Sequence, residues 1–274
     1  YYDDHSNVRD IGDNSHGTLM SGILASNGSF MGAAPEISLS VAISLGPSGK
    51  SGQEEMVSQA IRWCRISQDA DIISLSLGAN PGMGMDDESE TTLAVQEALD
   101  DGIFVIAAAG NTGLNADITD VSIPANIEGV ISVAATNKNG NIWKNSAFGS
   151  ETDSFTGEER VFPNQKPEIS APGVRLYSTY SSASDSALYA YSSGTSDSTV
   201  LVTGALALIL EKYGEDIAGT DGKIDYSEIN LVKVALANSA NSDDQDYIHH
   251  SQRGYGQLDA TAWAEQIRIE FGIE

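Results

Sequence analysis

The chain has 274 residues, of which 41% are hydrophobic and 27 are glycine, a composition typical of a globular α/β protein and unlike that of a disordered chain. Its 14 basic and 39 acidic residues give a formal net charge of −25, so nucleic acids and anionic membrane surfaces would repel it. Its one cysteine, Cys64, excludes an internal disulfide, and no run approaches the ~20 apolar residues of a membrane span.

The first informative block is Asp13-Asn14-Ser15-His16-Gly17-Thr18, which leads into a predicted helix over residues 19–25. A histidine at the start of a helix is either a capping or packed residue or a general base. The chain has four histidines, and His249 and His250 lie in a polar loop. His16 is therefore the favoured base.

Strand and helix patterns then alternate along the chain. The predicted strands are residues 37–43, 71–77, 103–109 and 130–135, and the predicted helices between them are residues 53–67 and 89–101. Cys64 lies on the apolar side of the first of these helices, so we expect it in the core. The alternation predicts a doubly wound, mostly parallel α/β sheet with helices on both faces, and ligands bind such sheets at the carboxyl ends of the strands. Polar residues 151–165, 181–193 and 239–253 are predicted to be surface loops.

Ala107-Ala108-Ala109-Gly110-Asn111 ends one of these strands. Asparagine commonly forms turns, which is the simpler interpretation. The small residues before it, however, suggest a wall that another group approaches closely. We therefore favour an Asn111 amide that faces a pocket as a hydrogen-bond donor.

Gly194-Thr195-Ser196 precedes the apolar, helix-like stretch 199–210. A serine here would lie beside free backbone N–H groups and the positive end of the helix dipole. Alone, it is best explained as a helix N-cap. Together with His16 and Asn111 it completes a hydroxyl nucleophile, an imidazole base and an amide donor, which are the groups needed for acyl transfer by a serine hydrolase.

Six blocks in the same order resemble the subtilases, the subtilisin-like serine proteases. They are Asn14-Ser15-His16-Gly17-Thr18, Ser74-Leu75-Ser76-Leu77-Gly78, Ala107-Ala108-Ala109-Gly110-Asn111, Ala171-Pro172-Gly173-Val174, Gly194-Thr195-Ser196 and Gly254-Tyr255-Gly256-Gln257-Leu258-Asp259-Ala260. Each block is weakly specific, but the ordered set covers nearly the whole chain. The resemblance implies a secreted or cell-surface serine endopeptidase with one catalytic domain over residues 1–274.

The resemblance also implies roles for individual residues. Ser196 would be the nucleophile, His16 the base, and Asn111 a donor in the oxyanion hole. Ser76, Leu77 and Gly78 would pair with the backbone of an extended peptide substrate, and Gly52 would lie on the other side of it. Ala108, Ala109 and Gly110 would line a pocket with room for a large apolar or aromatic side chain. An ordinary loop explains the glycine-rich run 46–52 equally well.

Two segments depart from the family pattern. Asp197-Ser198-Thr199-Val200 replaces the usual Met-Ala-Ser-Pro after the nucleophile, which places a carboxylate at 197 to cap the helix or tune the site. Residues 221–228 resemble the latter half of an EF-hand calcium loop, with Asp221, Asp225 and Glu228 as weak candidate ligands. Since Ile217 and Gly219 fall where carboxylates should be, we favour a turn and a capped helix. We expect no cofactor for the chemistry and keep structural calcium as the alternative.

The triad acid is not identifiable. In the family an aspartate ends an early strand well before the histidine. The only aspartates before His16 are Asp3, Asp4, Asp10 and Asp13, none follows an apolar strand, and we interpret them as surface-loop residues. Tyr1 does not look like a translation start, so we expect a mature or truncated product whose N-terminal strand region is missing. A possible partner is that N-terminal fragment as a separate chain.

Two function classes therefore stay open: an active endopeptidase, and a catalytically impaired subtilase-like protein that serves as a binding or structural subunit. An α/β-hydrolase esterase is disfavoured, because no Gly-x-Ser-x-Gly is present and His16 precedes Ser196.

Overall fold

The structure is a computed structural model that describes residues 10, 12, 14–46, 48, 54–82, 86–181, 187–242 and 248–274. The first half of the chain contains α1 (His16–Ala25), α2 (Glu55–Ser67), β1 (Ile72–Leu75), α3 (Glu90–Asp100), β2 (Phe104–Ala108) and β3 (Ile131–Thr136). The second half contains β4 (Ile169–Pro172), β5 (Val174–Thr179), β6 (Tyr189–Ser193), α4 (Thr195–Ala218), a 3-10 turn (Gly219–Asp221), α5 (Tyr226–Ser239) and α6 (Ala260–Phe271).

A four-stranded parallel sheet in the order β1-β2-β3-β4 forms the centre of the molecule. β2 and β3 are apolar or small along their whole length and completely buried, because parallel strands are covered on both faces. The register pairs Ser74 of β1 with Ile106 of β2, and Ala108 of β2 with Val133 of β3. The parallel α/β prediction is thus confirmed.

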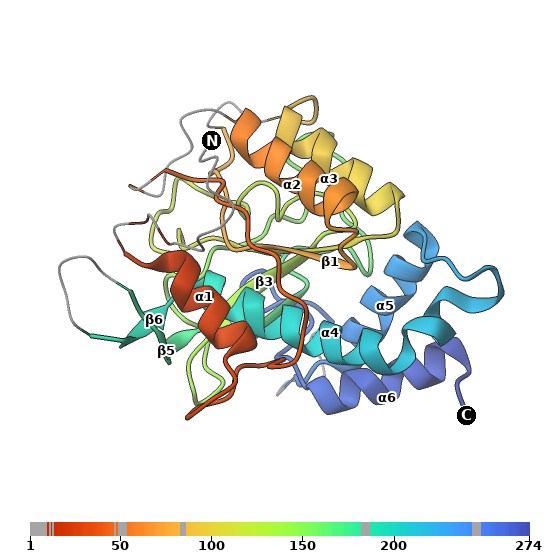
Figure 1. Ribbon diagram of the computed structural model, residues 1–274. Coiled ribbons are helices and arrows are strands. Elements are labelled where there is room, and N and C mark those ends of the chain that lie inside the picture. Colours follow the sequence, from red (N-terminus) through yellow and green to blue (C-terminus); the bar gives the residue numbers. More distant parts are fainter. Residues whose placement is uncertain are drawn as a thin grey trace.

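Helices cover both faces of this sheet (Figure 1). α4 packs against all four strands on one face, and α1 packs beside α4. α3 covers β2 on the other face, and α2 packs on α3. α5 and α6 form a pair that also contacts α4. Cys64 of α2 is partly buried against the main core, as predicted. No helix in the described ranges is long and apolar enough to cross a membrane.

The predicted strand over residues 37–43 is wrong. Residues 38–44 make no backbone hydrogen bond with any described residue, and Leu39, Val41 and Ile43 are exposed. Their apolar alternation is that of a strand, but a strand forms only where a neighbouring backbone pairs with it. On the side of β1 away from β2, likewise, no strand pairs with it among the described residues. The sheet therefore has an open edge facing this segment.

One further difference concerns the predicted loop 181–193. Its last five residues form β6, which pairs antiparallel with β5 in a two-stranded hairpin. Figure 1 shows this hairpin beside α1 and the start of α4. The alternating tyrosines of β6 suit a strand, although its polar surroundings resemble a loop. The hairpin matters for the site because a single residue, Gly194, separates its end from the start of α4.

Candidate active site

Four segments lie at the carboxyl edge of the sheet: the residues after β1, the residues after β2, the first turn of α1 and the first turn of α4. The structure brings His16, Asn111 and Ser196 to the wall of one cavity there. This is the edge at which parallel α/β sheets bind ligands. The three residues that the sequence selected therefore line the same cavity.

Asn111 is held in a defined orientation. Its side-chain Oδ1 accepts hydrogen bonds from the backbone N–H of Thr195 and from the Thr195 hydroxyl, both at 3.0 Å. A backbone N–H can only donate, so the atom facing it is the oxygen of the amide. The Nδ2 group makes no hydrogen bond in the described structure and points away from Thr195, as a free donor. Thr195 was missed by the sequence reasoning, although it directly precedes Ser196.

Close approach of two loops fixes the start of α4. A Cβ on Gly173 would lie 2.2 Å from the Ser198 hydroxyl oxygen, so only glycine fits where the residues after β4 meet this helix. The Gly194 N–H donates to the Gly173 carbonyl at 2.8 Å. The turn that carries Ser196 is thereby tied to the end of the sheet.

Ser196 is part-buried at the cavity wall. Its hydroxyl donates to the Ser76 carbonyl at 3.3 Å, and the Ser76 hydroxyl donates to the Ser196 carbonyl at 3.1 Å. The Ser196 N–H has no acceptor among the described residues, as expected in the first turn of a helix. Two free donors, this N–H and Asn111 Nδ2, therefore lie at the start of α4, where a Cβ built on Gly194 would be 3.7 Å from the first nitrogen and 3.5 Å from the second.

His16 begins α1 and is exposed at the mouth of the cavity. Partial removal of water by the surrounding protein lowers its pKa, while the charge of Asp10 opposes this effect. A lowered pKa keeps the imidazole neutral near pH 7, as a general base requires. Among the described residues His16 forms no hydrogen bond, whether to Ser196 or to a carboxylate.

Asp10 is more than a surface-loop residue, contrary to the sequence interpretation. Its Oδ2 accepts from the Thr18 N–H and the Thr18 hydroxyl, both at 2.8 Å, and its Oδ1 accepts from the Gly12 N–H at 2.9 Å. Burial would raise the pKa of Asp10, but these hydrogen bonds outweigh it and lower the pKa. Asp10 thus caps the first turn of α1 and does not hold the imidazole. Asp3, Asp4 and Asp13 lie outside the described residues.

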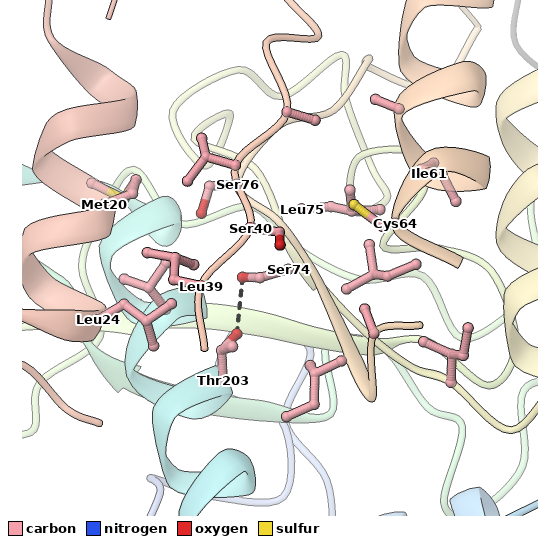
Figure 2. Close-up of a pocket in the computed structure, with 18 of the residues that line it drawn as sticks. Met20, Leu24, Leu39, Ser40, Ile61, Cys64, Ser74, Leu75, Ser76 and Thr203 are labelled. Atoms are coloured by element: carbon pink, nitrogen blue, oxygen red, sulfur yellow. Dashed lines mark hydrogen bonds between the residues drawn. The ribbon is translucent and has the colours of Figure 1, made fainter. Parts of the chain in front are cut away.

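The cavity extends far beyond the three candidate residues, along the open edge of β1. Its volume is ≈ 3230 Å³, several times the ~300–1,000 Å³ of a small-molecule pocket. Figure 2 shows Met20 and Leu24 of α1, Leu39 and Ser40 of the unpaired segment, Ser74, Leu75 and Ser76 around β1, Ile61 and Cys64 of α2, and Thr203 of α4 around it. An edge strand on one side and apolar side chains around it suit an extended polypeptide better than a small molecule.

The predicted substrate contacts are partly brought together. Ser76, Leu77 and Gly78 line the cavity, and their backbone N–H groups make no hydrogen bond in the described structure. Ala108 and Gly110 line it too, and Gly110 has φ +108° with Ser122 directly behind it, which favours glycine. Ala109 is completely buried in the main core and does not line the cavity. Gly52 lies outside the described residues.

Asp197 follows Ser196 in the chain and is 1% exposed. The Ser192 hydroxyl of β6 donates to its Oδ2 at 3.0 Å, whereas its buried Oδ1 has no partner. Burial raises the pKa of Asp197 to about 6, and the hydrogen bond from Ser192 opposes this shift. The carboxyl is therefore a buried titratable group beside the candidate site.

The weak calcium candidates form a helix cap. Asp225 accepts from the Ser227 N–H at 2.7 Å, and Glu228 accepts from the Asp225 N–H at 3.0 Å, a capping box at the start of α5. Asp221 accepts from the Lys223 N–H at 3.1 Å. The predicted turn and capped helix are confirmed. No cluster of three potential metal-binding side chains occurs within the described part of the chain.

Comparison with known proteins identifies relatives over most of the chain. The model of the Subtilase family matches residues 1–256. Subtilisin DY of Bacillus licheniformis is 34% identical over 203 residues, which are 73% of this chain and 65% of that protein. The Major intracellular serine protease of Bacillus subtilis (strain 168) is 34% identical over 207 residues, which are 74% of this chain and 57% of that protein. The chain thus spans less than two thirds of the length of these relatives.

A solved structure supports the fold. The self-cleaved protease domain of PatA matches with a TM-score of 0.70 over 97% of this chain and 86% of that chain, at 21% sequence identity. At this identity the similarity concerns the fold alone. It agrees with the parallel sheet and flanking helices described above.

We predict that calcium removal has no effect through residues 221–228. Because Asp225 and Glu228 are engaged in the cap, EDTA should leave the melting temperature unchanged in the protein and in Glu228→Gln, whose amide oxygen can still accept the backbone hydrogen bond. Differential scanning calorimetry with and without EDTA measures this. An EDTA-induced decrease in melting temperature that disappears in Glu228→Gln would show that the segment binds metal.

Proposed function

The chain belongs to the subtilase family of serine peptidases, and on that premise we propose that it is a serine endopeptidase that cleaves peptide bonds through an acyl-enzyme on Ser196. The observation that carries the proposal is the pair of free donors at the start of α4, the Ser196 N–H and Asn111 Nδ2. The Thr195–Asn111 hydrogen bonds hold one of them, Asn111 Nδ2, in place.

In the proposed reaction the Ser196 Oγ attacks the scissile carbonyl carbon while His16 takes the hydroxyl proton. The carbonyl oxygen becomes an oxyanion, which the Ser196 N–H and Asn111 Nδ2 stabilise by hydrogen bonds. His16 then protonates the leaving amine, and water hydrolyses the acyl-enzyme by the same route in reverse. The hydrogen bond from Ser196 to Ser76 must break first, since Ser196 Oγ has one proton to donate. No cofactor takes part, and any calcium would be structural.

An extended peptide is the proposed substrate. The free backbone groups at residues 76–78 would pair with it as with an added strand. The substrate side chain before the cleaved bond would enter the space beside Ala108 and Gly110. Both residues are small, so they leave this space open. Small residues in the wall of this space favour a large apolar or aromatic substrate side chain there.

We propose that the triad acid comes from a strand that fills the open edge of β1. Such a strand, parallel to β1, would end beside Ser76, at the edge of the sheet where His16 lies. The unpaired edge, the unpaired segment 38–44 and the large cavity between them support this. The strand belongs to an N-terminal segment, either joined to this chain or kept as a separate fragment.

The absence of any carboxylate hydrogen-bonded to His16 in the described structure favours a second candidate for the chain by itself. Residues 1–274 alone would be a catalytically impaired subunit that binds peptide but turns it over slowly.

We place the complete protein outside the cell or on its surface, because its net charge of −25 suits a strongly solvated acidic surface. The similarity to a protein named an intracellular serine protease makes cell fractionation the test of this placement.

We predict that a fluorophosphonate probe labels Ser196 in the complete protein. The probe phosphonylates an activated serine hydroxyl, and its oxygen occupies the oxyanion site. Mass spectrometry of the labelled peptide locates the adduct. Ser196→Ala should not react, whereas the control Ser198→Ala, on the same helix turn, should retain the adduct at Ser196. Labelling of another residue with Ser196 unmodified would refute the proposed nucleophile.

We also predict that Asn111→Leu lowers kcat by about 10²–10³-fold with little change in KM, the loss that removing such a donor causes in subtilisin itself. The amide would bind the oxyanion of the transition state more strongly than the neutral carbonyl of the substrate. Steady-state kinetics on a chromogenic peptide separates the two constants. A large increase in KM with unchanged kcat would instead place Asn111 in substrate binding.

A further inference from the structure

The buried Asp197 carboxyl has no role in the proposed reaction. It lies on the first turn of α4, next to the nucleophile, and is 1% exposed. Ser192 donates to one of its oxygens, and the other oxygen has no partner in the described structure. A buried ionised carboxylate with one hydrogen bond is unfavourable. The position therefore favours the neutral acid.

The Asp197 carboxyl lies close to both proposed oxyanion donors. A Cβ built on Gly194 would be 3.5 Å from Asn111 Nδ2, 3.5 Å from Asp197 Oδ2 and 3.7 Å from the Ser196 backbone nitrogen. The three atoms thus lie within 3.7 Å of a single point. Any charge on Asp197 acts on the place where the negative charge of the oxyanion develops.

Among the described residues, no opposite charge forms an ion pair with this carboxyl. On the elements packed around the start of α4, the titratable or charged side chains are His16 of α1, Arg175 and Tyr177 of β5, and Tyr189 and Tyr191 of β6. Strands β1 to β4 carry none. Arg175 lies over the Tyr191 ring, 5.2 Å from its centre, and forms no ion pair with Asp197. Among the described residues, the Ser192 hydroxyl and the backbone of Asp197 itself stabilise the charged form, and burial outweighs both.

We propose that Asp197 is an electrostatic control on the oxyanion hole: as a neutral acid it leaves the site competent, and as a carboxylate it repels the oxyanion and slows acylation. The inference rests on the proposed function of Ser196. Two like charges several ångströms apart in a part-buried site interact strongly enough to change a rate by about 10- to 100-fold. Asp197 acts through its charge and not by contact with the substrate.

This control makes the rate of Ser196 acylation decrease on the high-pH side of its pH profile, which is the falling limb. The rate rises with pH as His16 loses its proton and becomes a base. It falls again as Asp197 ionises, which its raised pKa of about 6 places just below neutrality. The profile of Ser196 acylation is therefore bell-shaped, and the enzyme favours mildly acidic conditions.

The test measures the second-order rate constant of fluorophosphonate labelling at Ser196 between pH 5 and 9, in the complete protein. Asp197→Asn keeps the size of the side chain but cannot ionise. We expect it to lose the falling limb and to react about 10- to 100-fold faster than the unmodified protein at pH 8. The matched control is Asp216→Asn, an exposed carboxyl further along the same helix, which should leave the profile unchanged.

Ser192→Ala is the second variant. It removes the hydrogen bond that stabilises the carboxylate, so the pKa of Asp197 should rise and the falling limb should move to higher pH. A purely structural role for Asp197 would not shift the limb in this direction. A falling limb that persists in Asp197→Asn, or that does not move in Ser192→Ala, would overturn the proposal.

A readout without activity separates this inference from the proposed function. Because the pKa of Asp197 is higher in the folded than in the unfolded chain, the unfolded state ionises first, and folding stability falls as pH rises from about 4 to 6. The melting temperature of Asp197→Asn should therefore exceed that of the unmodified protein by more at pH 7 than at pH 4. An equal difference at both pH values contradicts the inference even if Ser196 never reacts, whereas absence of labelling in every variant contradicts the proposed function.

Discussion

The open edge of β1 is the constraint on which the rest of the structure depends. A parallel strand in the interior of a sheet satisfies its backbone groups on both sides, and β1 does so on the β2 side only, as far as the described residues show. Residues 38–44 have the apolar pattern of a strand and also lack a partner. Both features fit the strand proposed above, which would lie between them in the cavity along β1.

The parts of the site that this chain contains are held independently of that strand. Asn111 is fixed by Thr195, Ser196 is tied to Ser76, and Asp10 caps the helix that begins with His16. Each contact joins the end of one element to the start of another. Ser196 and Asn111 are thus held in place by hydrogen bonds, while the His16 imidazole forms no hydrogen bond in the described structure. The exposure of His16 is consistent with this incomplete side of the site.

The sequence predicted the elements whose pattern is local. Residues 103–109 and 130–135 are apolar throughout and form buried strands, and Asp225 with Glu228 forms the predicted cap. What depends on distant partners could not be predicted. Residues 37–43 have the pattern of a strand, but no described segment pairs with them as a neighbouring strand, and Ala109 lies in the core while Ala108 and Gly110 line the cavity. The buried ion cluster of Lys166, Glu168 and Lys233 likewise depends on Lys233, which lies 65 residues after Glu168 in the sequence.

The most direct test of the account is the peptidase rate of residues 1–274 with and without the polypeptide encoded upstream of Tyr1, added as a separate chain or joined. We expect kcat of residues 1–274 alone to be about 3 × 10⁴-fold lower than that of the complete protein, which is the loss that removal of the triad acid causes in subtilisin. The upstream segment should restore it, an Asp→Asn change at the end of its strand should abolish the restoration, and Asp10→Asn should have little effect. Full activity of residues 1–274 alone, lost in Asp10→Asn, would contradict the account.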